Sequence, residues 1–327
     1  MIDFESIKQT SEMLRSEVVR TPLLNSPWVD KMTGGRIFFK AECLQRTGSF
    51  KIRGATNKII SLEPEVRQCG VVAYSSGNHA QGVAAAATSR QIKATIVMPH
   101  QAPEMKINNT RDLGANIVLY DRESESREEI AADIAKRQGF LVVPPYDDQI
   151  VITGQATVGY EILEQIEELA INPDSLLCPC GGGGLIAGVS SAIKARRSNM
   201  NIYSVEPDDF DDTRRSLEAG KRVANLAGVS SICDAIVTPT PGKITFEINR
   251  CLLSGGFRVS DESVRQAVLL SFDRLKLVVE PGAAVGLAAL ISGQFDATDK
   301  TVIVVLSGGN MDVKQFCEFR QQSLNQN

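Results

Sequence analysis

Apolar residues along the chain alternate between short runs typical of strands and longer segments with helical spacing. Between residues 64 and 148, four strand-like runs are separated by three amphipathic segments. The runs are 70–74, 94–99, 116–120 and 140–143, and the segments between them are 81–90, 104–113 and 126–138. Because strands that alternate with helices pair in parallel through right-handed crossovers, this region is predicted to be a small parallel α/β unit.

Similar runs and segments occur both before and after this region. Strands are expected at 37–41, 175–179, 201–205 and 301–306, and helices at 4–19, 52–62, 153–169 and 185–197. The sequence therefore predicts an α/β protein with two open parallel-sheet domains. The smaller domain, residues 64–148, is inserted into a larger discontinuous one that comprises residues 1–63 and 149–327.

Composition and charge narrow the classes of function. The 327 residues are 43% hydrophobic and 23% charged, with a formal net charge of −4, and no cluster of Lys and Arg stands out. A nucleic-acid partner is therefore not expected. No stretch approaches the ~20 apolar residues of a membrane span, and the start resembles no secretory signal. No membrane association is expected, and a cytoplasmic location follows.

The cysteines and histidines exclude several catalytic centres. The seven cysteines are scattered and odd in number, which is typical of free thiols in a reducing compartment. The two histidines, His79 and His100, are too few for a histidine-rich metal centre. The chain also lacks the Gly-x-Ser-x-Gly elbow of many serine hydrolases. The chemistry must use other groups.

Lys51 is the first candidate for that chemistry. It stands between Phe50 and Ile52, after the strand at 37–41 and at the start of the helix at 52–62. Partial desolvation disfavours the charged form of an amine and makes it available as a nucleophile or a Schiff-base partner. The alternative is an ordinary solvated lysine.

Four consecutive glycines, Gly181, Gly182, Gly183 and Gly184, separate a predicted strand from a predicted helix. Without Cβ atoms the backbone can approach a phosphate closely, and the N–H groups and the helix dipole can hold the anion. The tract has neither the lysine of a Walker A loop nor the Gly-x-Gly-x-x-Gly spacing. A small phosphorylated ligand is favoured over a flexible turn, because four glycines carry a large entropic cost.

Three further segments follow predicted strands, where open α/β sheets bind ligands. The polar stretch 75–79 could capture a carboxylate, although Ser75 alone could be a helix cap. Ser307 could meet a ring nitrogen of a cofactor, or belong to a simple turn. The acidic stretch 206–212 could hold a hard divalent cation or be a solvated loop.

Taken together, these segments resemble a known family. The stretches 49–54, 75–82, 181–184 and 307–310 occur in the order and rough spacing of the fold-type II pyridoxal phosphate (PLP) enzymes. The closest resemblance is to the threonine/serine dehydratase and serine racemase family, and it covers nearly the whole chain. The resemblance implies a tryptophan synthase β-like fold, PLP as cofactor, a small amino acid as substrate and a homodimer.

The resemblance also implies roles for the cofactor residues. Lys51 would bind PLP as a Schiff base and remove the Cα proton of the substrate. Phe50 and Asn78 would hold the pyridine ring and its 3-hydroxyl, and the glycines from Gly181 to Gly184 would hold the phosphate. Ser307 would face the ring nitrogen, and a neutral partner there leaves that nitrogen largely unprotonated.

Other residues would surround the substrate. Ser75, Asn78 and His79 would lie around its carboxylate. Catabolic threonine dehydratases resemble Ser-Ala-Gly-Asn-His in this motif, and Ser76 stands where they have alanine. In racemases a serine at this position reprotonates the carbanion on the face opposite the lysine. Arg127 matches an arginine of racemases and 3-hydroxyaspartate dehydratases, and a guanidinium suits a second carboxylate. The alternative for Arg127 is a surface charge paired with glutamates.

The resemblance raises the acidic stretch to a predicted metal site. Glu206, Asp212 and the carbonyl of Phe210 match the magnesium site of racemases, so a divalent cation (Mg, Ca or Mn) is expected. Two stretches depart from the racemase pattern. Residues 144–148 resemble dehydratases instead. Residues 239–246 contain no match for the substrate-side serine of racemases, and Thr238 or Thr240 could take its place. The regulatory domain of biosynthetic threonine dehydratases is not seen, so isoleucine feedback is not expected.

These observations predict that the protein is a PLP-dependent ammonia-lyase. It would eliminate water from serine, threonine or 3-hydroxyaspartate, with some racemisation. The alternative within enzymes is a serine or aspartate racemase. A remote alternative is a non-catalytic ligand-binding module that kept the fold.

Overall fold

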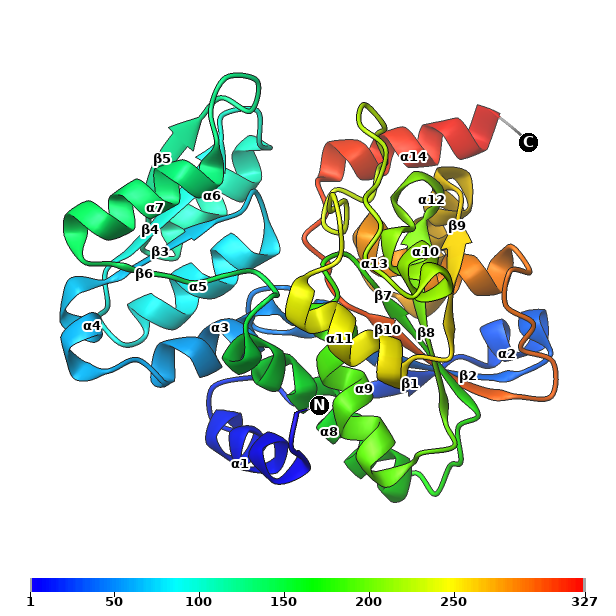
Figure 1. Ribbon diagram of the computed structural model, residues 1–327. Helices are drawn as coiled ribbons and strands as arrows, with labels where there is room; N and C mark the ends of the chain where they lie inside the picture. Colours follow the sequence, from blue (N-terminus) through cyan, green and yellow to red (C-terminus); the bar gives the residue numbers. More distant parts are fainter. Residues whose placement is uncertain (1, 326–327) are drawn as a thin grey trace.

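Two open β-sheets, each with helices on both faces, organise the chain (Figure 1). The computed structural model describes residues 2–325. The predicted α/β class with two sheets is confirmed, and all strand pairs are parallel except that of β1 with β2.

The smaller sheet has the strand order β5-β4-β3-β6 and is drawn in blue to green (Figure 1). All four predicted strands and all three predicted helices of this unit are present, with ends that differ by a few residues. The strands are β3 (Val71–Tyr74), β4 (Ala94–Pro99), β5 (Asn116–Tyr120) and β6 (Leu141–Val142). The helices are α4 (Pro64–Cys69), α5 (Asn78–Thr88), α6 (Glu104–Asp112) and α7 (Arg127–Gln138).

The larger sheet has the order β1-β2-β10-β7-β8-β9. Its strands come from both ends of the chain, as predicted, and are β1 (Leu23–Asn25), β2 (Arg36–Ala41), β7 (Ser175–Pro179), β8 (Asn201–Pro207), β9 (Gly255–Val259) and β10 (Thr301–Leu306). The helices of this part are α1 (Phe4–Leu14), α2 (Pro27–Thr33), α3 (Lys51–Ile60), α8 (Gln149–Glu168), α9 (Gly184–Arg196), α10 (Asp212–Ala219), α11 (Lys243–Leu252), α12 (Asp261–Leu270), α13 (Pro281–Ile291) and α14 (Val313–Asn325). Single turns η1 (Glu42–Leu44), η2 (Asp208–Phe210) and η3 (Ser271–Leu275) complete it.

Alternate residues of the larger sheet pack into two apolar layers. In β10, Val302 and Val304 face the layer that contains α12 and α13, whereas Ile303 and Val305 face α8 and α9. This period of two is the pattern of a strand covered on both faces. The sheet is therefore buried between helices, and its strand ends lie at the edge of the layers.

Several elements were not predicted because their sequences lack a clear period. The strand β9 begins with Gly255 and Gly256, and glycine weakens a strand signal. In α13, ten of the eleven residues are buried, so no polar face reveals the helix.

Helix α3 packs on both units. Ile52, Ala55 and Ile59 belong to the apolar cluster of the smaller sheet and α5, while Gly54 lies against Gly154 of α8. A methyl group in place of a hydrogen on Gly154 would lie 2.6 Å from the Cα of Gly54. The predicted domain limits remain a prediction, since α3 shares its two faces between the units.

Helices α8 and α9 approach each other just as closely. A methyl group on Gly188 of α9 would lie 2.6 Å from the backbone nitrogen of Ala156, and one on Gly159 of α8 would lie 2.7 Å from the carbonyl oxygen of Val189. Glycine at these crossings lets the backbones touch. The three helices α3, α8 and α9 therefore form one tightly packed stack.

Two general expectations can be compared with the structure. None of the helices within residues 2–325 has the length and apolar character needed to cross a membrane. All seven cysteines are free thiols, and four of them, Cys43, Cys178, Cys180 and Cys233, are buried.

Candidate active site

One cavity collects the residues that the sequence analysis proposed for cofactor and substrate. Its walls come from the two units and from the segment that joins β6 to α8. The predicted residues among them are Phe50, Lys51, Ser75, Ser76, Asn78, His79, Arg127, Gly181, Gly182, Gly183, Gly184 and Ser307. The three predicted metal residues do not line this cavity and are described separately below.

Sheet topology explains why Lys51 and Ser307 meet. The strands β2 and β10 are parallel neighbours, so their carboxyl ends lie side by side. The loops that follow are hydrogen-bonded to each other: the Phe50 N–H donates to the Ser307 carbonyl at 3.1 Å and the Gly309 N–H donates to the Gly48 carbonyl at 2.8 Å. Two distant motifs are thereby held at one edge of the sheet.

The Lys51 amine lies in the wall of the cavity. Nζ donates a hydrogen bond to the Pro145 carbonyl at 2.7 Å and lies 5.2 Å from the centre of the Phe50 ring. Burial lowers the pKa of Lys51 to about 8, against the opposing effect of the negative charge of Glu280. An amine of this kind is neutral in a useful fraction near neutral pH, as the sequence analysis expected.

The glycine loop between β7 and α9 has the shape of an anion site. Gly183 has φ of +89°, in the left-handed region that favours glycine. A side chain at Gly182 would overlap the ring of Tyr146, and a methyl group at Gly181 would lie 2.9 Å from the Cα of Ile236. No side chain caps α9. The N–H groups of its first turn therefore remain available to an anion such as a phosphate.

The start of α5 forms another part of the wall. The Gly77 N–H donates to Ser75 Oγ at 3.2 Å, and the Ser76 hydroxyl forms no hydrogen bond with a described residue. His79 Nε2 donates to the Val143 carbonyl at 2.9 Å, while burial and the Lys51 charge lower the pKa of His79 to about 3. The imidazole is neutral, so it offers no positive charge to a substrate carboxylate.

Glu280 is a residue of the cavity that the sequence analysis missed. It is buried before the first turn of α13 and accepts a hydrogen bond from Asn78 Nδ2 at 2.5 Å, while Asn310 Nδ2 donates to Asn78 Oδ1 at 2.7 Å. Burial raises the pKa of Glu280 to about 7. The only sequence signal is a glutamate before Pro281, a common helix start.

Further lining residues were also missed or left open. Lys106 of α6 donates to Asp234 of the other unit at 2.6 Å across the cavity wall. The guanidinium of Arg127 lies 5.4 Å from the centre of the Tyr74 ring, and Nε donates to Glu128 at 2.8 Å. Of the two threonines left open, Thr238 lines the cavity. Ion pairs between distant segments leave no local signal in a sequence.

The chain is similar to known proteins over most of its length. A family described as "Pyridoxal-phosphate dependent enzyme" matches residues 14–308. The chain belongs to this family. The L-threonine ammonia-lyase of Thermotoga maritima is 42% identical over 96% of this chain and 77% of its own length. The L-threo-3-hydroxyaspartate ammonia-lyase of Saccharomyces cerevisiae is 37% identical over 96% of this chain and 94% of its own.

The fold is shared with solved relatives of the same family. The structure of maize serine racemase matches with a TM-score of 0.91 at 36% identity, over 99% of this chain and 98% of its own. The predicted fold-type II PLP architecture is therefore confirmed.

The cavity of this PLP-family chain fits the cofactor chemically. It offers a partly buried amine, a glycine loop without side chains at a helix N-terminus, and the neutral hydroxyl of Ser307. These match the aldehyde, the phosphate and the ring nitrogen of PLP. The individual roles of the residues remain predictions.

The predicted metal residues lie in a second, buried acidic site. Glu206 at the end of β8 accepts hydrogen bonds from the N–H groups of Thr213 and Arg214 at 2.9 and 2.8 Å. Asp212 Oδ1 accepts one from Asn225 at 2.7 Å, while its Oδ2 is buried without a partner among residues 2–325. Burial and the charge of Asp212 raise the pKa of Glu206, and burial raises that of Asp212 to about 7.

This acidic site is not a cluster of three or more metal-binding side chains. No such group of His, Cys, Asp and Glu occurs in the part of the chain that the structure describes. A metal there would depend on the two carboxylates together with oxygen ligands such as the Phe210 carbonyl. Two buried acids and a carbonyl are the oxygen donors that hard cations prefer.

The reactivity of Lys51 is expected to depend on pH in a measurable way. Its pKa of about 8 lies below the ordinary 10.5, so about half of the amine is neutral at pH 8, against less than about 1% for an ordinary lysine. Reductive methylation of the cofactor-free protein, followed by peptide mass spectrometry, should give a half-maximal rate at Lys51 near pH 8.

The matched variant is Glu280→Gln. Because the Glu280 charge raises the pKa of Lys51, its removal should move the midpoint to lower pH. A wild-type midpoint near 10.5 would contradict the assignment.

Proposed function

We propose that this chain is a PLP-dependent ammonia-lyase, which converts a small β-hydroxy amino acid into a 2-oxo acid and ammonia. The substrate is serine, threonine or 3-hydroxyaspartate. One observation carries the proposal: a single cavity brings together the Lys51 amine, the glycine loop 181–184, Ser307 and the N-terminus of α5. Relatives named for threonine and 3-hydroxyaspartate ammonia-lyase support it.

PLP, when bound, draws electrons from the Cα of the attached amino acid and so makes the Cα–H acidic. Lys51 would hold the cofactor, the glycine loop would bind its phosphate, and Phe50 and Asn78 would hold its ring and its 3-hydroxyl. When it is not bonded to the cofactor, the Lys51 amine would take the Cα proton, because its lowered pKa leaves it partly neutral. Ser307 would meet the ring nitrogen without adding charge.

Elimination then requires proton transfer to the β-hydroxyl. The Cβ–O bond would break as this oxygen receives the proton that the Lys51 amine has taken from Cα, so water leaves, and a further water molecule would hydrolyse the released enamine to the 2-oxo acid and ammonia. The N–H groups at the start of α5 and the Ser75 hydroxyl hold the substrate carboxylate. This assignment relies on neutral donors because His79 carries no charge.

Arg127 supports 3-hydroxyaspartate as one of the substrates. Its guanidinium lines the cavity at the start of α7 and could form a forked hydrogen bond with a second carboxylate. It now pairs with Glu128, which is half exposed. Exchange of that partner for a substrate carboxylate costs little, because exposed ion pairs are weak.

A serine or aspartate racemase is the second candidate, and Ser76 is the observation that favours it. The Ser76 hydroxyl lines the cavity and is not bonded to any described residue, so it is available to return a proton to Cα. Relatives named serine racemase include the maize protein. We propose that racemisation accompanies elimination.

The acidic site is proposed to bind a divalent cation, Mg²⁺, Ca²⁺ or Mn²⁺. Glu206 and Asp212 are both fully buried and form no ion pair with any residue that the structure describes, and burial of two carboxylates is costly without a compensating charge. The unpartnered Asp212 Oδ2 supports this assignment.

Homodimer formation and a cytoplasmic location are also proposed. The apolar groove beside α14, lined by Phe272, Val278, Val313 and Phe316, supports a contact with a second copy, since exposed apolar patches mark interfaces. The seven free thiols support a reducing compartment.

A substrate panel tests the main proposal. The protein loaded with PLP should form 2-oxo acid from at least one of L-serine, L-threonine and 3-hydroxyaspartate, and should absorb visible light. Lys51→Ala should lose this absorbance and lower the rate of oxo acid formation by about 10³-fold, because it removes both the cofactor link and the base.

Lys58→Ala is the matched control for this panel. Lys58 lies on the same helix but outside the cavity and pairs with Asp148, so its loss should leave absorbance and products in place. A loaded wild-type protein that forms no oxo acid from any of the three would refute the lyase proposal. Formation of the D-isomer without oxo acid would favour the racemase. If neither product forms, the non-catalytic module is favoured.

Ser76→Ala separates racemisation from elimination. It should lower the rate of D-isomer formation by about 100-fold while the elimination of the L-substrate stays within about fivefold, since only the proton donor is removed. Chiral chromatography and the oxo acid assay, run on the same samples, measure both. An equal fall of the two rates would show that Ser76 does not act on a separate face.

Removal of the cation should destabilise the protein. A chelator should lower the melting temperature by roughly 3 °C or more, and Mg²⁺ or Ca²⁺ should restore it. Asp212→Asn should abolish this response, whereas Asp209→Asn, at an exposed position in η2, should keep it. A wild-type melting temperature that does not respond to the chelator would exclude the site.

A further inference from the structure

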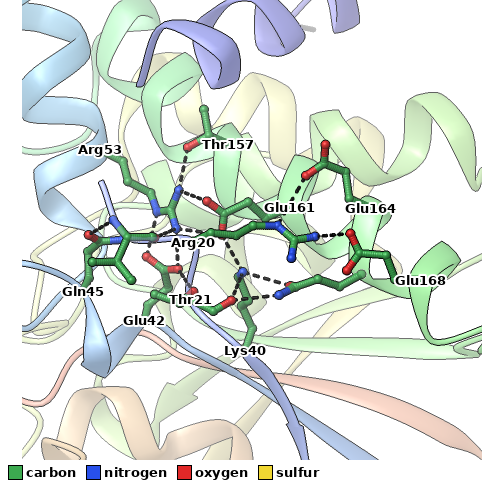
Figure 2. A network of polar contacts seen from close by, with 12 residues as sticks. Arg20, Thr21, Lys40, Glu42, Gln45, Arg53, Thr157, Glu161, Glu164 and Glu168 are labelled. Carbon is green, nitrogen blue, oxygen red and sulfur yellow. Dashed lines mark hydrogen bonds and ion pairs between the residues drawn. The ribbon is translucent and has the colours of Figure 1, made fainter. Parts of the chain in front are cut away.

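Arg53 is part of the lysine motif, but neither the cavity nor the proposed chemistry uses it. It follows Lys51 by two positions in α3 and is 0% exposed. At about 100° per residue, side chains two positions apart point to nearly opposite sides of a helix. Lys51 therefore faces the cavity. Arg53 points toward Glu42 in η1 and Glu161 in α8 (Figure 2).

All the N–H groups of the guanidinium have acceptors. Nε and Nη2 donate to the two oxygens of Glu42, each at 2.8 Å. Nη1 and Nη2 donate to the two oxygens of Glu161 at 2.7 and 2.9 Å, and Nη1 also contacts Thr157 Oγ1 at 3.2 Å. Arg53 thus holds one carboxylate on each of two edges in a forked arrangement (Figure 2).

The carboxylates are themselves fixed by other groups. Lys40 Nζ donates to Glu161 at 2.6 Å, to Gln165 at 3.0 Å and to the Thr21 carbonyl at 2.8 Å. The Thr21 hydroxyl donates to Glu42. The buried cluster contains two positive and two negative side chains and is neutral as a whole.

Stability alone is a weak explanation for such a cluster. Ion pairs in a dry interior gain little over well-packed apolar residues, because desolvation offsets their attraction. The planar guanidinium adds orientation. Its two forked pairs of hydrogen bonds have fixed angles and so allow only one orientation of the side chain, whereas the single point charge of a lysine allows many.

Close backbone contacts hold α3 against α8 on one side and against α5 on the other. The Gly54 N–H donates to Gln155 Oε1 at 3.1 Å, at the glycine crossing that sets the distance between α3 and α8. A methyl group on Gly82 of α5 would lie 3.1 Å from the carbonyl carbon of Lys51. These contacts fix where α3 lies, but the glycines have no side chains that would fix its rotation about its own axis.

We propose that Arg53 is a positioning residue whose two carboxylate forks set the rotation of α3 and so aim the Lys51 amine at the reacting carbon. The proposal rests on the role of Lys51 in the proposed function. A small rotation of α3 would displace the amine while the binding groups of α5 and α9 stay in place. Misplacement by about 1 Å can cost about 10²-fold in rate.

The test is Arg53→Lys, which keeps the charge and removes the forks. We expect the cofactor content to be retained, kcat to fall by about 10- to 100-fold and KM to stay within about threefold. The visible circular dichroism of bound PLP, which reports its orientation on Lys51, should change in band size or sign.

Lys40→Met is the matched control. Lys40 lies on β2 in the same cluster and donates to Thr21, Glu161 and Gln165, none of which belongs to α3. Its loss should therefore lower the melting temperature while kcat and the circular dichroism band stay close to wild type. If Arg53→Lys keeps both properties, or if Lys40→Met loses kcat equally at a similar melting temperature, the cluster only stabilises the fold and the positioning role is wrong.

A milder variant covers the outcome in which Arg53→Lys does not fold. Thr157→Val removes one acceptor from the same guanidinium and should give the same split between kcat and KM on a smaller scale, about two- to fivefold. An unchanged kcat and an unchanged circular dichroism band in this variant would then overturn the proposal. If the substrate panel fails, the circular dichroism of bound PLP still tests positioning independently of turnover.

Discussion

The close crossing of α3 on α8 is the contact on which the site depends. At Gly54 and Gly154 the two backbones touch, and a side chain at either position would separate them. Helix α8 makes an equally close contact with α9, which begins at the glycine loop. The helix that carries the amine and the helix that carries the anion site are therefore both held by α8, so their separation is determined by backbone contact rather than by flexible side chains.

Burial of charge determines the chemistry around this stack in two different ways. Around Arg53, two carboxylates are matched by two cations within hydrogen-bonding distance, and the cluster is neutral. In the acidic site, Glu206 and Asp212 form no ion pair with another described residue, and burial raises the pKa of both. Burial of a charge is costly in both places. The Arg53 cluster offsets this cost with its own cations, whereas the acidic site lacks such cations among the described residues and is therefore a candidate cation site.

Local pattern predicted much of the fold, and it failed where the signal is not local. Alternating apolar runs predicted all four strands of the smaller sheet because each strand is apolar and bounded by turns. The strand β9 and the helix α13 were missed, since the former starts with two glycines and the latter has no polar face. Glycine and serine motifs located most of the cavity, yet Glu280, Lys106 and Asp234 were missed because their partners lie far away in the chain.

By itself, the sequence determined the α/β class, the inserted smaller sheet, the family and the segments that line the cavity. Each of these follows from short-range information: residue period, glycine runs and motif order. Only the tertiary structure decided that His79 is neutral, that Glu280 lies near the amine and that Arg53 binds Glu42 and Glu161 outside the cavity. Protonation and orientation depend on desolvation and on charges brought together from distant segments, and both exist only once the chain has packed.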